Sequence, residues 1–129
     1  MKISTLIDET GSAQKTLEAF DRLTAQLLKP NIAYRVSRNI SAVKPDLVSY
    51  EKQRVELIVK KYGVKIGKDG NDGYQVPPES LGAFLDDLKL LQDEDVTEPH
   101  RKIDLADIPI ISANDIALLA FMLNLPEDA

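Results

Sequence analysis

A regular pattern of apolar residues runs through the middle of the chain and ends at Tyr62-Gly63. Its members are spaced alternately three and four apart, which places them along one side of a helix. The spacing predicts one long helix that packs against a second helix or against a copy of itself. We call these residues the seam, and it comprises Val36, Ile40, Val43, Leu47, Tyr50 and Leu57, with Arg54 at a further seam position.

Pro45 lies within this predicted helix, and the spacing continues across it without a change of phase. Proline costs about 3 kcal/mol in a helix interior, because it lacks an N–H and its ring crowds the preceding turn. Two alternatives follow from this. Either one helix is kinked at Pro45, or the helix breaks at residues 42–44 and restarts with proline in its first turn.

The rest of the chain divides into short elements around this helix. An amphipathic helix precedes it, so residues 12–63 are predicted to form an antiparallel helical hairpin. We predict a single domain of residues 1–129, of the α+β class and mostly α-helical, with two short C-terminal helices. The other predicted elements are a strand or arm at 1–11, a β-hairpin at 64–76, a helix at 79–92, an edge strand beside the hairpin at 96–103 and a helix at 112–124.

Composition narrows the classes of function. The chain has 129 residues and a net charge of −5. An acidic balance disfavours general binding to nucleic acid, because phosphate neutralisation requires a basic excess. The absence of cysteine excludes disulfides and thiolate metal sites, and it is typical of a reducing compartment.

Two features of the sequence bear on its location. No apolar run approaches the roughly 20 residues that a membrane-spanning helix needs. The first residues turn acidic where a signal peptide would remain apolar. We therefore expect a cytoplasmic protein with no membrane partner.

No motif in the sequence is a strong signature of catalysis or metal binding. The loop at residues 69–73 is rich in Asp, Asn and Gly, but its spacing does not match an EF-hand. His100 is the only histidine, and no cysteine accompanies it as a second metal ligand. Neither Ser80 nor Ser112 lies in a nucleophile elbow. We expect a protein that is not an enzyme and holds no metal or cofactor, with a carboxylate-dependent hydrolase as a weak third alternative.

Cations, an aromatic ring and an amide gather near the start of the long helix. Such a combination can hold a phosphate and stack a base. A cation at position 54 extends this set along the seam. The predicted ligand-binding residues are Tyr34, Arg35, Arg38, Asn39 and Arg54.

Ion pairing is the competing interpretation of these arginines. Arg35 and Arg38 would then pair with acids of the preceding helix, such as Glu18 and Asp21. Arg54 would pair with a buried acid across a dimer interface and so fix the register of two helices.

Several segments between about residues 30 and 123 occur in a familiar order. They are the run Tyr34–Asn39, the helix that carries Glu51, Arg54 and Leu57 and ends at Lys61-Tyr62-Gly63, the Asp69-Gly70 turn before Tyr74-Gln75-Val76, and Ser112-x-x-Asp115. This order resembles that of small proteins of tailed bacteriophages and prophages, which are domains of unknown function. The resemblance assigns no catalytic residues. It implies a phage setting, either as an accessory of virion assembly or as an early protein that inhibits a host system.

We therefore expect a non-enzymatic interaction protein that acts as a homo-oligomer through the seam, in the cytoplasm of a bacterial host. Its partner would be a second copy, or a host or phage protein. The alternative function is a small-ligand-binding protein that sequesters a phosphate-bearing, cyclic nucleotide signal of host antiviral defence.

Overall fold

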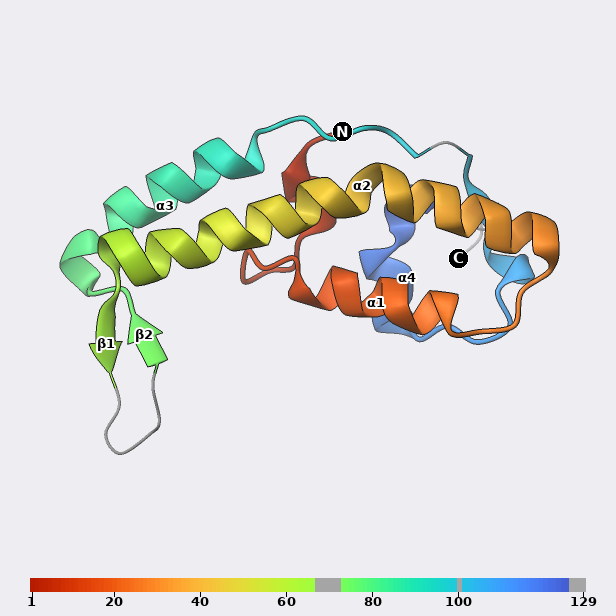
Figure 1. The fold of residues 1–129 in the computed structure, drawn as a ribbon, viewed down its shortest axis with the longest axis horizontal. Helices are drawn as coiled ribbons and strands as arrows, with labels where there is room; N and C mark the ends of the chain where they lie inside the picture. Colours follow the sequence, from red (N-terminus) through yellow and green to blue (C-terminus); the bar gives the residue numbers. More distant parts are fainter. Residues whose placement is uncertain (67–72, 100, 126–129) are drawn as a thin grey trace.

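One long helix, α2 (Pro30–Glu56), spans the molecule, and the other elements lie along it (Figure 1). The computed structural model describes residues 1–66, 73–99 and 101–125. Helix α1 (Gln14–Thr24) packs against the N-terminal half of α2, and α3 (Pro78–Gln92) lies beside its C-terminal half. The fold is mostly helical and of the α+β class, with two small two-stranded sheets.

Helix α2 continues through Pro45, so of the two alternatives the break at residues 42–44 is excluded. The ring of Pro45 lies on the exposed side of the helix, while Val43 and Leu47 on the opposite side are buried. The Ser41 carbonyl, which loses its helical N–H partner to proline, also lies on an exposed turn where water can bind it. Packing of the seam therefore keeps the helix continuous at a position that is unfavourable by local propensity.

The long helix ends in a π-helical segment, η2 (Leu57–Tyr62), followed by Gly63. The Gly63 N–H donates to the Ile58 carbonyl at 2.7 Å. A β-carbon at position 63 would lie 2.0 Å from that oxygen, so only glycine fits this approach. The predicted stop at Tyr62-Gly63 is confirmed.

The predicted β-hairpin is also confirmed. Strand β1 (Val64–Ile66) pairs antiparallel with β2 (Gly73–Gln75), and Lys65 lies opposite Tyr74. Most of the Asp-, Asn- and Gly-rich loop at residues 69–73 falls outside the described residues, and so does His100. The predicted helix at 79–92 is confirmed as α3.

The predicted N-terminal strand is wrong for most of its length. Residues Ile3–Leu6 form a 3-10 helix, η1, which buries the side chains of Ile3 and Leu6 in the core. Only Lys2 forms a bridge, with Asp95. Because Ile3 and Leu6 both need a buried position, a one-turn helix suits them better than an alternating strand.

The C-terminal third differs most from prediction. The edge strand expected at 96–103 is reduced to β3 (Ile103–Asp104), which pairs in parallel with β4 (Leu123–Asn124) and not with the hairpin. The helix expected at 112–124 ends early, as α4 (Ala113–Leu118), and two 3-10 turns occur nearby, η3 (Leu105–Asp107) and η4 (Ala120–Met122). Pairing with β3 satisfies the backbone at 123–124 and buries Leu123 against Ile103, which outweighs helix continuation.

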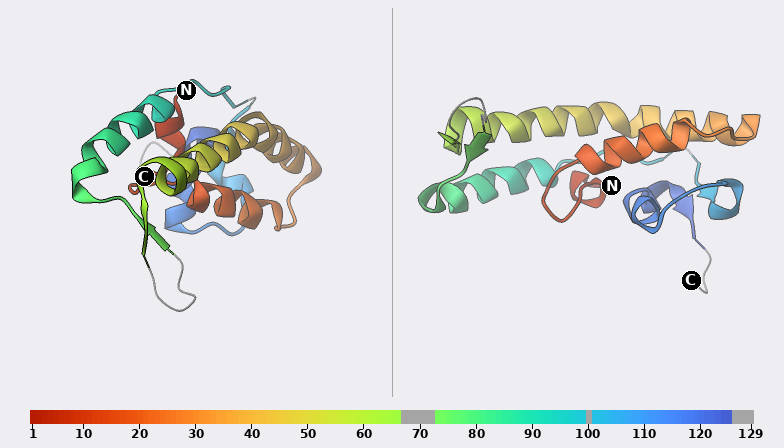
Figure 2. Two further views of the ribbon diagram at one scale, coloured as in Figure 1. Left: turned by 60° about the vertical axis from the view of Figure 1, so that its left-hand side comes forward. Right: turned by 90° about the horizontal axis from the view of Figure 1, so that it is seen from below.

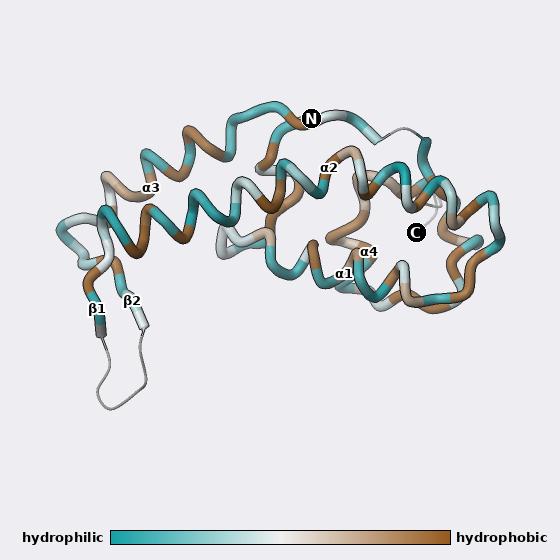
Figure 3. Tube along the Cα trace, in the orientation of Figure 1, coloured by the Kyte–Doolittle hydropathy of each residue, from teal (hydrophilic) through white to brown (hydrophobic). Residues whose placement is uncertain are grey.

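Two regions can be distinguished along α2. At one end, α1, α4 and the short sheet surround the N-terminal half of the helix (Figure 2). At the other end, residues 51–66 and 73–92 form a projecting pair of helices with the hairpin at its tip, which we call the arm. Apolar residues recur along α2 into the arm, although fewer elements cover it there (Figure 3). Within the described residues, no helix is long and apolar enough to cross a bilayer.

Candidate functional site

The seam is packed within one chain. Val36, Ile40, Val43, Leu47 and Tyr50 are buried, and Leu57 is half-buried against the same core. Their neighbours in this core include Phe20 and Leu23 of α1. These side chains are therefore not exposed to a second copy, and any surface for self-association must lie elsewhere.

Arg54 has a partner within the chain. Its guanidinium donates to both carboxylate oxygens of Glu51, at 3.1 and 3.2 Å, so the predicted intersubunit role has no basis in the contacts. The Ala13 N–H also donates to Glu51, at 2.6 Å. Burial raises the pKa of Glu51, but the hydrogen bonds from Arg54 and Ala13 outweigh it and the pKa is lowered. Glu51 thus fastens the start of α1 to α2.

The loop before α1 is held by a second contact. The Tyr50 hydroxyl donates to the Gly11 carbonyl, and Gln92 of α3 donates to the same hydroxyl at 3.3 Å. Gly11 has a φ of +81°, a conformation that favours glycine. This loop therefore lies against one side of the α2–α3 pair.

A bidentate ion pair that the sequence analysis missed joins α1 to α4. Arg22 donates to the two oxygens of Asp115, at 2.9 and 2.7 Å. The predicted cap is confirmed, since the Asp115 N–H donates to the Ser112 hydroxyl at 3.1 Å. The hydrogen bond from Arg22 lowers the pKa of Asp115, against the opposing effect of burial. A carboxylate with a lowered pKa is a poor general acid, so this pair is best explained as structural.

Acid is expected to weaken this ion pair. A carboxylate whose pKa is lowered by folding stabilises the protein above its unfolded-state pKa, and the contribution is lost as pH falls through the lowered value. Asp115→Asn should therefore melt below the wild type at pH 7, and the difference in melting temperature should shrink as pH falls below about 4. Thermal unfolding followed by circular dichroism at several pH values measures this. Asp86→Asn, at an exposed position of α3, is the control, and an equal pH dependence in both variants would contradict the assignment.

The predicted ligand-binding set does not come together as a whole. Asn39 is fully buried, and its amide donates to the Arg101 carbonyl at 2.7 Å and accepts from the Arg101 N–H at 3.2 Å. Arg54 lies 16 positions along the helix from Arg38, or about 24 Å away. Asn39 and Arg54 are thus excluded from a site at the start of α2, and these two predictions are wrong.

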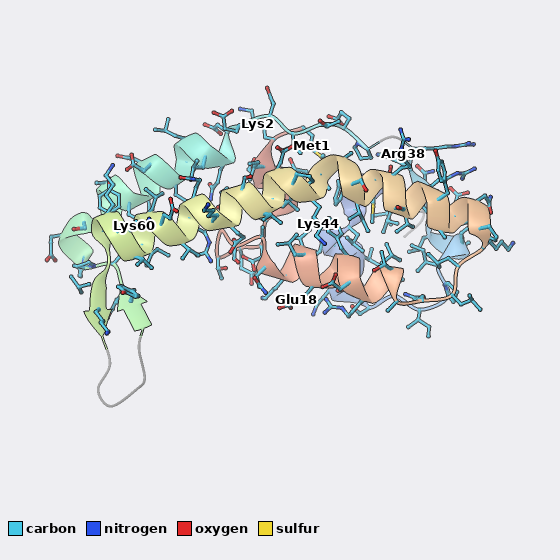
Figure 4. All side chains as sticks on the ribbon, in the orientation of Figure 1. Met1, Lys2, Glu18, Arg38, Lys44 and Lys60 are labelled. Carbon is cyan, nitrogen blue, oxygen red and sulfur yellow. The ribbon has the colours of Figure 1, made fainter. Side chains whose placement is uncertain are left out.

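Three members of the set do lie together. Tyr34 is exposed, Arg35 is half-buried, and the Arg38 guanidinium lies 6.0 Å from the centre of the Tyr34 ring. The predicted pairing with Glu18 and Asp21 is wrong, since no ion pair to Arg35 or Arg38 occurs among the described residues. Figure 4 shows Arg38 on the outer side of α2.

The fold adds two cations to these three residues. Because Asn39 binds the backbone of Arg101, the exposed side chains of Arg101 and Lys102 are carried to the same stretch of α2. In the sequence these two residues lie more than 60 positions from Arg35 and Arg38. The one feature that marks them there is that two basic residues stand side by side. We call the resulting surface the basic cluster, and it comprises Tyr34, Arg35, Arg38, Arg101 and Lys102.

The second exposed feature is apolar and lies on the arm. Segment η2, which continues α2, is joined there to α3 by the Tyr62 and Phe84 rings, 6.1 Å apart, and by an ion pair of 2.8 Å between Lys61 and Asp87. Flanking this contact are exposed apolar side chains one helical turn apart on each helix. We call them the arm face, and they are Val55 of α2 and Val59 of η2 with Leu81 and Leu85 of α3.

Each half of the arm face continues a strip whose far end is linked to the loop before α1. Val55 of α2 and Val59 of η2 follow Glu51 at steps of four in the sequence, and Glu51 binds the Ala13 N–H. On α3, residues 81, 85, 88 and 92 form one strip, and Gln92 reaches Tyr50, which binds Gly11. One end of each strip is thus linked to the same loop.

Two surfaces, the basic cluster and the arm face, therefore lack partners among the described residues. Over residues 1–66, 73–99 and 101–125, no group of three or more His, Cys, Asp or Glu side chains is arranged to hold a metal ion. Comparison of the chain with protein-family models, with curated proteins and with solved structures gives no match.

Proposed function

We propose that the protein is a non-enzymatic interaction protein that self-associates through the arm face. The observation that carries this proposal is the pair of exposed apolar strips on a two-helix arm, which no other part of the described chain covers. Apolar side chains gathered on one face indicate a contact surface more strongly than scattered ones do. Of the exposed large apolar side chains in the described parts of the chain, more than half lie on the arm: Val55, Val59, Val64, Tyr74, Leu81, Leu85 and Leu90.

A second copy of the chain is the occupant that the arm fits best. Two amphipathic helices side by side bury their apolar face when they pack on an identical pair, which gives a four-helix bundle with two-fold symmetry. The charge of the arm permits such an approach. Residues 51–66 and 73–92 carry six basic and five acidic side chains, whereas the whole chain has a net charge of −5.

The setting proposed for this function rests on the order of sequence segments described above. It is that of a phage or prophage protein in the cytoplasm of a bacterial host, which acts in virion assembly or inhibits a host system. In either role the dimer would be the unit that presents the remaining surface to a partner. This setting does not enter the argument for the arm face.

Leu85→Asp is expected to convert a dimer into a folded monomer. The substitution places a charge in the centre of the proposed contact, where two copies of it would be buried without a partner. Native mass spectrometry and light scattering at protein concentrations of about 10 to 100 μM (affinities in this range are common for modest interfaces) measure the subunit number.

Leu90→Asp is the matched control, because Leu90 lies on the opposite side of α3 and is 70% exposed, against 50% for Leu85. The control should remain dimeric, and both variants should keep the melting temperature of their common fold. A wild-type protein that is monomeric at the highest concentration, or a Leu85→Asp variant that remains dimeric, would refute self-association through the arm face.

A further inference from the structure

The basic cluster lies at the other end of α2 from the arm face, and we infer that it binds a phosphate group of a nucleotide, with Tyr34 stacking on the base. The inference is independent of the proposed self-association, because it uses no residue of the arm. It is carried by four cations that have no carboxylate partner among the described residues, beside an exposed aromatic ring.

The absence of ion pairs at these cations is notable because the protein is rich in acids. It has 21 acidic and 16 basic residues, so acids outnumber bases in the chain as a whole. Arg22, Arg54 and Lys61 each have such a partner. Arg35, Arg38, Arg101 and Lys102 have no ion pair within the described ranges, and they gather at one place. Such a gathering is stable when an anion is present to balance it.

The fold holds part of this cluster rigidly. Asn39 binds both the N–H and the carbonyl of Arg101, so the backbone that carries Arg101 and Lys102 is fixed on α2. Arg35 and Arg38 lie on the adjacent helical turns, three residues apart and therefore on neighbouring positions of the surface. A buried amide used in this way pre-positions two separate segments, which lowers the entropy cost of binding an anion between them.

Tyr34 adds an element that a simple phosphate site does not require. Its side chain is 59% exposed, and the Arg38 guanidinium lies 6.0 Å from the ring centre. A cation at this distance from the ring keeps both groups in one place without using all the N–H donors of arginine. An exposed ring beside guanidinium groups is the arrangement that stacks a base while its phosphate is neutralised.

Glu98 lines a hollow beside Arg38, and its carboxylate has another partner. A hollow of about 360 Å³ beside Arg38 is lined by Ser41, Ala42, Thr97 and Glu98. The Glu98 carboxylate forms an ion pair with the N-terminal ammonium group of Met1 at 2.8 Å. Glu98 is therefore not bound to Arg38, and the guanidinium retains donors for a ligand.

The same chemistry can come from a mononucleotide or from single-stranded nucleic acid. Two probes separate these sources: adenosine triphosphate, and a fluorescent single-stranded oligonucleotide of 12 thymidines. Calorimetry and fluorescence polarisation at about 50 mM salt measure binding of each, since electrostatic contacts are strongest at low salt. We expect dissociation constants in the micromolar range for at least one probe.

Charge reversal at the cluster tests the residues. Arg38→Glu and Arg101→Glu should each weaken binding of the retained probe by about tenfold or more, because each removes a phosphate contact and adds a repulsive charge. Lys52→Glu is the matched control, since it makes the same charge change on an exposed position of α2 about 21 Å away from Arg38. The control should change binding less than twofold.

Tyr34→Ala distinguishes a nucleotide site from a general anion site. The substitution should weaken binding of the base-bearing probe severalfold but leave competition by inorganic pyrophosphate unchanged. Binding of neither probe at low salt would overturn the inference, as would equal loss of binding in Lys52→Glu and Arg38→Glu. Because Leu85→Asp leaves the cluster intact, loss of self-association in that variant would not alter these results.

Discussion

Replacing Leu47 by aspartate is expected to unfold the protein. Leu47 is fully buried in the middle of α2, with 0% of its side chain exposed. The substitution removes the contacts of a core leucine and places a carboxylate, or its protonated form, where no hydrogen-bond partner is available. The cost should exceed about 4 kcal/mol, which is most of the stability of an ordinary domain. Far-ultraviolet circular dichroism and urea denaturation at neutral pH measure it.

Val48→Asp is the control for this substitution. Val48 is the next residue of the helix and is 48% exposed, so an aspartate there remains hydrated and should cost less than about 1 kcal/mol. A Leu47→Asp variant that dissociated from a dimer but kept its melting temperature would show that the seam is an intersubunit contact. That outcome would contradict the intrachain core described here.

Asn39→Leu is expected to have the second-largest effect. The Asn39 side chain is 0% exposed and makes two hydrogen bonds to the backbone of Arg101. Leucine has a similar volume but leaves the N–H and carbonyl of Arg101 without these partners. We expect a loss of about 2–4 kcal/mol in the free energy of unfolding, since each unpaired buried group costs about 1–3 kcal/mol. Urea denaturation of the purified variant measures this loss.

The position of Arg101 gives this substitution a second readout. If Asn39 anchors residues 101–103 to α2, backbone amides there should exchange hydrogen faster in Asn39→Leu than in the wild type. Ser37→Ala, at an exposed position on the same helix, should change neither stability nor exchange by a measurable amount. A loss below about 0.5 kcal/mol in Asn39→Leu, the size of an ordinary surface effect, would mean that the two hydrogen bonds do not hold the segment.

Asn39 also shows how a residue type can be interpreted in two ways. In sequence it stands among cations and an aromatic ring, which favours a ligand contact. In the structure it is the buried residue that brings Arg101 and Lys102 to Arg35 and Arg38. Its side chain binds no ligand, yet the basic cluster depends on it.

Local periodicity was enough to predict the main elements. The seam spacing predicts α2 because neighbouring side chains on a helix face recur every three to four residues, whatever they pack against. The alternation around the turn residues predicts β1 and β2, and Gly63 marks the end of the long helix. These features depend on residues close to one another in the chain, so the sequence alone determined them.

Only the tertiary structure decided which surfaces are free. The apolar seam has the same pattern whether its partner is α1 or a second copy. Because the seam shares one core with Phe20 and Leu23, its partner lies within the same chain. The pairing of Arg22 with Asp115 and the pairing of β3 with β4 each have the same kind of origin. A hydrogen bond or ion pair between distant segments depends on where the whole chain places them, and sequence spacing carries no record of that placement.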